Sequence, residues 1–287
     1  MINYYYNLFP QKILYRKDYI EFVSTSNYYY LMPEKNKLKD AIVIDRILKF
    51  NQINIYDFVL NKNQQYISVI NNKKYVLLKL LVERSNDEID FNDLILFSKI
   101  KLNYNSYISW KKRWIKKNDV LEKCSVNLIS KNDELNKLLN YFIEVSENAI
   151  MYSNYHIVEY KNQYNVSLQH ERLSSKTKKR LIFYNPFFII LDNQTRDVSE
   201  LIKDLAFAEK NYEKLIEDVI KKMNLNYTDL KLLIARIMFP TYFFDYLENK
   251  NSNNKKIITY ASYYINIVNQ IVKTINKYSE VPIPYHH

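Results

Sequence analysis

The chain of 287 residues contains no glycine. Glycine adopts positive φ angles without strain and lets a backbone approach a phosphate closely. Walker loops, dinucleotide-binding fingerprints and glycine-rich nucleotide loops all depend on it, so none of these phosphate-binding loops can form here. At an ordinary usage of roughly 7%, a chain of this length would contain about twenty glycines. The absence therefore excludes a large group of nucleotide-dependent functions.

Codon composition offers one cause of the loss. Glycine codons are GC-rich, whereas the abundant Lys, Asn, Ile and Tyr residues have AT-rich codons. An AT-rich genome would deplete the first and enrich the others. Complete loss still indicates that no glycine is indispensable, because a phosphate-binding glycine should resist such drift.

The composition is that of a globular protein, with 47% hydrophobic and 15% aromatic residues. The N-terminus has no signal-peptide pattern, and no run approaches 18 uninterrupted apolar residues, so we expect a cytoplasmic protein without a membrane span. The single cysteine, Cys124, excludes an intramolecular disulfide and a cysteine-based zinc site.

The net charge of +11 raises the question of an anionic partner. Two basic clusters stand out, one at residues 111–117 and one at residues 176–180. Most of the charge is scattered, however, and Lys is favoured by AT-rich coding. We therefore favour a solvated basic surface over a nucleic-acid-binding face.

Residues 1–82 are predicted to form a small β-rich lobe with one helix. Aromatic and β-branched runs predict a hairpin, and Asn71 and Asn72 are expected in the left-handed positions that glycine normally fills. Tyr4–Tyr6 also lie in a strand-like context. The predicted strands are Tyr19–Ser24, Tyr28–Met32, Tyr56–Leu60, Gln65–Ile70 and Lys74–Val82, and the helix spans Lys37–Phe50.

Residues 83–287 are predicted to form a larger, mainly helical lobe, with Glu83–Asp87 as the hinge between the lobes. Asp90 is expected to cap the first helix, and Pro240 is expected to break a later one. The predicted helices are Asp90–Ile100, Ser106–Lys123, Lys131–Tyr155 and most of Arg196–Tyr278, with short strands at Tyr164–Leu168, Leu181–Tyr184 and Phe187–Leu191.

Three strings of residues make this order of elements more specific. They begin at Trp110 (WKKRWIKKNDVLE), Glu147 (ENAIMY) and Ala235 (ARIMFPTYFFD), and Arg196-Asp197 opens a helix between the last two. In this order, over roughly residues 105–247, the chain resembles bacterial spore-coat kinase-like proteins of the CotS/YutH type. Those proteins are distant relatives of aminoglycoside phosphotransferases and choline kinases. The resemblance implies an α+β, bilobal protein-kinase-like fold.

The resemblance also implies a degenerate catalytic loop at residues 170–177. Phosphotransferases of this superfamily use a His-Gly-Asp sequence followed five residues later by a magnesium-binding Asn. Here His170 is retained, Arg172 replaces the general base, and Thr177 replaces the Asn. Arginine cannot be deprotonated and so cannot act as a base. Threonine without carboxylate neighbours is a poor Mg²⁺ ligand.

The superfamily's second Asp, a metal ligand, depends on the register of the alignment. The register that places Arg196 and Asp197 correctly puts Phe188 at the metal position, and we favour it. The alternative register makes Asp192 the metal ligand.

The remaining cleft residues are then His170, Arg172, Asp192, Arg196 and Asp197. We interpret His170 as a structural histidine held within its loop. Arg172 is hypothesised to pair with Asp192 or Asp197 and so to replace a metal-centred site by a salt-bridged one.

These substitutions predict a catalytically inactive kinase-like protein, a pseudokinase without catalytic residues, metal or cofactor. The resemblance implies a structural or binding component with protein partners, located in the spore coat if the organism sporulates. The alternative is a degenerate but active small-molecule phosphotransferase that uses ATP and Mg²⁺ through Asp192. A third interpretation is an anion or nucleic-acid binder that works through the basic clusters.

Overall fold

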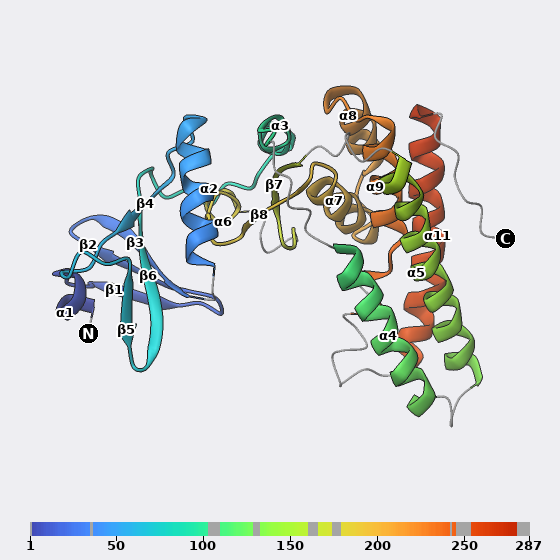
Figure 1. Ribbon diagram of the computed structural model, residues 1–287, viewed down its shortest axis with the longest axis horizontal. Coiled ribbons are helices and arrows are strands. Elements are labelled where there is room, and N and C mark those ends of the chain that lie inside the picture. Colours follow the sequence, from blue (N-terminus) through green and yellow to red (C-terminus); the bar gives the residue numbers. More distant parts are fainter. Residues whose placement is uncertain are drawn as a thin grey trace. The chain divides into compact units, whose positions relative to one another are not determined.

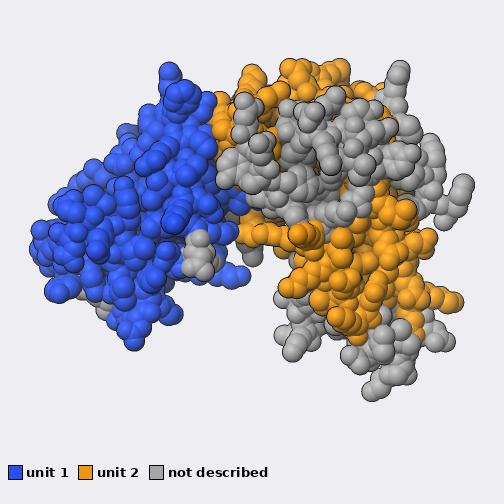
Figure 2. Space-filling model, in the orientation of Figure 1, with its two compact units in different colours: residues 1–89, 176–190 blue, residues 90–175, 191–287 orange. Residues whose placement is uncertain are grey.

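The computed structural model describes residues 2–34, 37–102, 110–128, 133–159, 166–173, 179–241, 243–244 and 254–279. The chain forms two compact units, which Figure 2 colours separately. The first comprises Met1–Ile89 and Lys176–Ile190, and the second comprises Asp90–Ser175 and Leu191–His287. The first unit thus includes Lys176–Ile190, which the sequence pattern predicted as part of the helical lobe of residues 83–287.

An antiparallel sheet of six strands forms the body of the first unit (Figure 1). The strand order is β1-β2-β3-β6-β4, and β5 pairs with β6 away from this path. The strands are β1 (Lys12–Tyr15), β2 (Ile20–Ser24), β3 (Asn27–Pro33), β4 (Tyr56–Val59), β5 (Ile67–Ile70) and β6 (Lys73–Leu80). The helices of this unit are α1 (Ile2–Tyr6), α2 (Leu38–Phe50) and α6 (Arg180–Phe183).

Both faces of the sheet are covered, because successive side chains of a strand point to opposite faces. Tyr29 and Leu31 of β3 belong to a buried cluster with Tyr6 of α1. Tyr30 of β3 belongs to a second cluster, which contains Ala41 of α2 and also Phe187 and its neighbours. Leu181, Phe187 and Phe188 therefore belong to the core of this unit.

Two turns of the sheet use left-handed residues in place of glycine. Asn71 and Asn72, between β5 and β6, have φ angles of 49° and 59°, as the sequence predicted. Thr25 and Ser26, between β2 and β3, have φ angles of 46° and 65°. Asparagine tolerates this region through local hydrogen bonding, whereas a β-branched threonine is strained there.

The second unit is mainly helical (Figure 1). Helix α5 packs against α4, α9 and α11. Its Phe142 ring stacks on Phe243 and contacts Tyr264, while Trp114 stacks on Phe239. The helices are α3 (Phe91–Lys99), α4 (Trp110–Leu128), α5 (Asp133–Glu159), α7 (Arg196–Phe207), α8 (Glu213–Lys222), α9 (Tyr227–Met238) and α11 (Asn254–Tyr278). Among the described residues, no helix is long and apolar enough to span a bilayer.

A second, two-stranded sheet pairs β7 (Val166–His170) with β8 (Ile189–Asn193). Strand β7 is buried along its whole length, and Asn193 at the end of β8 is fully buried. Their polar side chains must therefore find partners inside the protein. These partners form the candidate site described below.

Most of the predicted elements are confirmed. Asp90 caps α3 in a capping box with Asp93, and α9 ends at Met238, two residues before Pro240. Two strand predictions were wrong. Tyr4–Tyr6 lie in helix α1, because packing against the sheet overrides strand propensity there. Residues 181–183 lie in the short helix α6, and the Leu181 carbonyl accepts a hydrogen bond from the Tyr56 hydroxyl.

Candidate functional site

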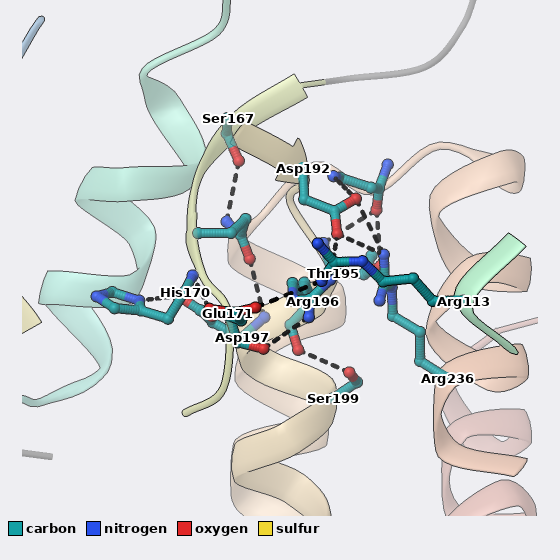
Figure 3. Close-up of polar contacts among 12 residues, drawn as sticks. Arg113, Ser167, His170, Glu171, Asp192, Thr195, Arg196, Asp197, Ser199 and Arg236 are labelled. Carbon is teal, nitrogen blue, oxygen red and sulfur yellow. Dashed lines mark hydrogen bonds and ion pairs between the residues drawn. The ribbon is translucent and has the colours of Figure 1, made fainter. Parts of the chain in front are cut away.

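His170 ends β7 and is held by Asp197 at the start of α7 (Figure 3). The imidazole Nδ1 lies 2.6 Å from Asp197 Oδ2, and the His170 backbone N–H donates to Asp197 Oδ1 at 2.9 Å. The ring of Phe97 stacks on the imidazole with centroids 5.7 Å apart. His170 is only 2% exposed. A buried imidazole oriented by a carboxylate and an aromatic ring is well suited to a structural role.

The same helix start is also tied to Gln169. The backbone N–H of Asp197 donates to Gln169 Oε1 at 2.8 Å, and Gln169 Nε2 donates to Ser167 Oγ at 3.0 Å. A carboxylate in the first turn of a helix is stabilised by the helix dipole. Strand β7 and helix α7 are therefore locked together through two adjacent residues of the strand.

Asp192 lies in β8 between two arginines (Figure 3). Arg196 Nη1 lies 2.6 Å from Asp192 Oδ2, and Arg236 Nη2 lies 3.0 Å from both carboxylate oxygens. The backbone N–H of Asn193 donates to Oδ1 at 2.7 Å. Asp192 is 2% exposed. Both carboxylate oxygens are therefore occupied by cationic or amide donors.

The electrostatics of this group follow from its partners. Burial raises the pKa of Asp192, but Arg236 and Arg196 outweigh it, so the pKa lies below its ordinary value. Burial lowers the pKa of Arg196, and the Asp192 carboxylate more than restores it, so that pKa is raised. Asp192 is therefore an ionised carboxylate in a buried ion-pair cluster.

Arg196 also fixes the chain just after His170. Its Nη2 donates to the backbone carbonyl of Glu171 at 2.6 Å. The Glu171 side chain is exposed and lies 3.5 Å from Arg113 Nη1. Arg172 is exposed, and its charge lowers the pKa of Glu200, although burial and Lys203 act on that pKa more strongly. Asp192 pairs with Arg196 and Arg236, and Asp197 pairs with His170. The pairing of Arg172 with either carboxylate stays a hypothesis.

A buried Lys-Glu pair extends the network. Lys203 is fully buried, and its Nζ lies 3.0 Å from Glu200 Oε1 and 3.0 Å from the Arg236 carbonyl. Burial lowers the pKa of Lys203 and the Glu200 carboxylate only partly compensates. Burial raises the pKa of Glu200, but Lys203 and the nearby arginines lower it overall. The ion pair lies within α7, and the hydrogen bond from Lys203 to the Arg236 carbonyl joins α7 to α9.

The turn between β8 and α7 is set by Asp229 of α9. Asn193 Nδ2 donates to Asp229 Oδ1 at 2.7 Å, and Gln194 Nε2 donates to Oδ2 at 2.6 Å. Asp229 also completes the capping box of α9 with Asn226. The fully buried Asp229 carboxylate therefore stabilises the turn that places Arg196 and Asp197.

The donor set does not fit a magnesium site. Mg²⁺ prefers carboxylate, carbonyl and water oxygens, and Asp192 offers its oxygens to two guanidinium groups instead. Within the described ranges, no three His, Cys, Asp or Glu residues are grouped so as to hold a metal ion. Thr177 lies outside the described residues.

The first unit contains a cavity of about 400 Å³. Phe188, at the favoured metal-ligand position, is half-buried and lines it. Burial raises the pKa values of Tyr30 and Tyr56, so both phenols in the wall are neutral near pH 7. The lining residues are Arg16, Tyr19, Glu21, Tyr30, Tyr56, Arg84, Ser85, Asn86, Lys179, Leu181, Ile182, Asn185 and Phe188.

Four of the five candidate cleft residues, His170, Asp192, Arg196 and Asp197, lie in this buried network, which also contains residues that were not candidates. Arg236, Lys203 and Asp229 were not among the predicted site residues. A signal existed for Arg236, because it is the single charge in the apolar run from Leu232 to Met238. A charge inside such a run indicates a buried ion pair.

Comparison with known proteins identifies one family over nearly the whole chain. The model described as "Spore coat putative kinase YutH" matches residues 1–281. This confirms the resemblance inferred from the sequence. No curated protein matches the chain at a significant level.

Solved structures share the fold at low sequence identity. An aminoglycoside phosphotransferase from Alicyclobacillus acidocaldarius is 10% identical with a TM-score of 0.66, covering 95% of this chain and 92% of that one. An amicoumacin kinase bound to AMP-PNP and Ca²⁺ is 11% identical with a TM-score of 0.57, covering 93% and 91%. An ethanolamine kinase from Plasmodium vivax is 12% identical with a TM-score of 0.51, covering 91% and 81%. The chain thus has the predicted α+β, bilobal protein-kinase-like fold.

Proposed function

This chain belongs to the YutH family of spore-coat kinase-like proteins, and we propose that it is a pseudokinase that serves as a binding or structural component of the coat. In this proposal the fold is retained while phosphoryl transfer is not. Protein partners, rather than a nucleotide and a metal ion, are its expected ligands. Its expected locations are the cytoplasm, where it is made, and the coat.

The state of Asp192 is the observation that carries this proposal. Phosphoryl transfer depends on positioning and on charge stabilisation around Mg²⁺. In the alternative register Asp192 is the metal ligand that an active site would need, and it is buried between Arg196 and Arg236. A metal ion would have to displace two guanidinium groups and would then face their positive charge.

The loop after β7 supports the same conclusion. Arg172 stands where the superfamily has its general base, and an arginine side chain offers donors but no acceptor for a proton. Phe188 stands where the favoured register places the metal ligand, and a phenyl ring offers no oxygen. The absence of glycine from the chain removes the usual phosphate-binding loop as well.

The test is ATP turnover by the purified full-length chain with Mg²⁺, with an active aminoglycoside phosphotransferase measured in parallel. We expect turnover at the background rate and no increase in Tm that requires both ATP and Mg²⁺. Turnover above background would contradict the proposal. If that turnover were also lost in Asp192→Ala, the chain would be the active phosphotransferase of the alternative interpretation.

Coat association has its own test. In a sporulating host, a fluorescent fusion of the full chain should collect at the spore periphery and be recovered in the coat extract. An exposed control substitution such as Lys17→Gln should not alter this location. A fusion that stays in the cytoplasm throughout sporulation would contradict the coat role. It would not bear on whether the chain catalyses phosphoryl transfer.

A further inference from the structure

We propose that strand β1, at the edge of the six-stranded sheet, pairs with an extended acidic segment of a partner protein. The inference rests on the proposed function, because it names the kind of protein that a chain with protein partners would bind. Among the described strands, β1 has β2 as its one neighbour. A strand in that position offers a row of backbone N–H and C=O groups to which another strand can be added.

The register of β1 determines which backbone groups face outward. Arg16 directly follows the strand, and its N–H donates to the Tyr19 carbonyl at 2.9 Å, so its backbone groups face β2. Successive residues of an antiparallel strand alternate in this respect. Leu14 therefore also faces β2, whereas the N–H and C=O groups of Ile13 and Tyr15 point away from it. These are the groups that an added strand would bond.

Exposed apolar side chains accompany these outward groups. Ile13 is paired with Phe22, and Tyr15 is paired with Ile20. Phe22 and Ile20 contribute to the buried cluster that contains Tyr6, so Ile13 and Tyr15 lie on the same face of the sheet as that cluster. Ile13 is nevertheless 42% exposed and Tyr15 is 78% exposed. The core of this face thus continues to the edge as exposed apolar surface, which an added strand would bury.

The opposite face of the same edge is basic. Lys12 and Arg16 stand at alternate positions, and both are exposed. Arg16 lies 3.6 Å from Glu21, but that carboxylate is buried and lies 2.7 Å from Arg84. Opposite charges across a strand pair stabilise a sheet, and like charges directly opposite each other destabilise it. A strand that fits this edge therefore has acidic residues opposite Lys12 and Arg16.

The two faces together define the sequence pattern of the partner segment. Residues that lie opposite each other on paired strands project to the same face. The residues opposite Ile13 and Tyr15 are therefore apolar, and those opposite Lys12 and Arg16 are acidic. The pattern is acidic-apolar-x-apolar-acidic, which is the same in both chain directions. Valine suits the apolar positions because β-branched residues favour strands.

A second copy of the chain fits this edge less well. Self-pairing that uses the outward groups of both Ile13 and Tyr15 is centred on Leu14. That pairing places Lys12 of each copy opposite Arg16 of the other, and like charges in this arrangement are destabilising. Lysine on an edge strand is a device by which proteins avoid edge-to-edge association. The occupant is therefore a different, acidic chain.

The experiment measures the Kd of the full-length chain for a labelled peptide by fluorescence anisotropy at low salt. The probe is the capped peptide Ser-Glu-Val-Thr-Val-Glu-Ser, and the charge control has lysine in place of both glutamates. We expect the acidic peptide to bind at least about fivefold more tightly than the lysine peptide, and more weakly at high salt.

Two N-methylated forms of the acidic peptide test backbone pairing. Alternate amides of an added strand face β1, so methylation of one alternate set removes hydrogen bonds and methylation of the other set leaves them. We expect one form to bind about tenfold more weakly than the parent peptide and the other to stay within about threefold.

Variants of the protein assign the binding to β1. Lys12→Glu should weaken binding of the acidic peptide about fivefold, and Tyr15→Pro about tenfold, because proline lacks the outward N–H. Proline is tolerated on an edge strand where the N–H faces solvent, so Tyr15→Pro should fold. Lys73→Glu reverses an exposed charge at the start of the inner strand β6 and should stay within about twofold.

Three results would overturn the inference: the acidic peptide binds no better than the lysine peptide, both methylated forms bind as the parent does, or Lys12→Glu and Tyr15→Pro bind as well as Lys73→Glu. A dimer in sedimentation that Tyr15→Pro dissociates would also overturn it, since a second copy would then occupy the edge.

Folding and function are controlled separately. Circular dichroism of each variant distinguishes lost binding from lost folding, and the comparisons among peptides need no variant. Turnover of ATP with Mg²⁺ would contradict the proposed function, whereas failure of the acidic peptide to bind would contradict only the assignment of this edge. The two failures are therefore distinguishable.

Discussion

At the scale of single residues, the clearest feature is the left-handed backbone that glycine would usually provide. Positive φ angles occur at nine described positions, and five of these are asparagine or threonine. Asn71 and Asn72 are suited to such angles, whereas Thr25 is not. The residues at these turns therefore differ in how much strain they hold.

Thr25→Gly should raise the free energy of unfolding by roughly 0.5–1 kcal/mol. Strain relief of about 1–2 kcal/mol is partly offset by the greater freedom of glycine in the unfolded chain. Asn72→Gly is the matched control and should change the stability by less than about 0.5 kcal/mol, since Asn tolerates its φ of 59°. Urea unfolding measures both, and a loss of stability in Thr25→Gly would contradict the strain argument.

Arg236→Met tests the buried ion-pair cluster. Removing one of the two guanidinium groups leaves Asp192 undercompensated, so we expect a loss of about 3 kcal/mol in the free energy of unfolding. Arg113→Met removes an exposed arginine that is paired with Glu171 and should cost less than about 1 kcal/mol. Equal losses in the free energy of unfolding would show that the buried cluster contributes no more to stability than the exposed Arg113–Glu171 pair.

At the scale of elements, helix starts are where side chains determine the local fold. Helices α3 and α9 both begin with a capping box, from Asp90 and Asn226 respectively. Helix α7 uses its first acidic residue, Asp197, to bind His170 instead. Polar side chains at the helix start thus stabilise α3 and α9, whereas in α7 Asp197 holds a residue of the candidate site.

Asp90→Ala should destabilise the protein by about 1 kcal/mol, because the amides of Asn92 and Asp93 lose their acceptor. Asp90→Asn retains an acceptor at the cap and should cost less than about 0.5 kcal/mol. Thermal unfolding followed by circular dichroism compares the two. The same Tm for Asp90→Ala and the wild type would indicate that the cap does not contribute.

At the scale of the whole molecule, the buried carboxylates link stability to pH. The pKa values of Asp192 and Glu200 are lower in the folded than in the unfolded chain. Their contribution is therefore fully present above their unfolded pKa values, which are near pH 4, and is lost as the pH falls through the lower folded values. The protein should be stable at neutral pH and weaken in acid.

Glu200→Gln separates this effect from the titration of all other carboxylates. At pH 7 the variant should be less stable than the wild type, because buried Lys203 loses its charged partner. The difference in the free energy of unfolding should shrink as the pH is lowered from about 5 to 3, since Glu200 itself becomes protonated. A difference that stays constant across this range would contradict the proposed titration.

The sequence predicted much of the fold because its elements are periodic and strongly marked. Strands β2 and β3, helix α2 and the cap of α3 follow from local patterns. The partners of Asp192 were harder to predict. Arg196 is four residues away, but Arg236 is 44 residues away, and only the packing of α9 brings it to β8. Likewise, Tyr4–Tyr6 have strand propensity, and the sheet face that selects a helix there is formed by distant residues.

The left-handed turns have a further consequence in the unfolded state. A chain without glycine has less backbone freedom to lose on folding, by roughly 0.4–1 kcal/mol for each glycine that another residue replaces without strain. Strained positions such as Thr25 reduce this stabilisation of the folded state. The positions in regular helices and strands retain it. The lack of glycine thus lowers the conformational entropy of the unfolded state along the whole chain, much as a cross-link lowers it at one place.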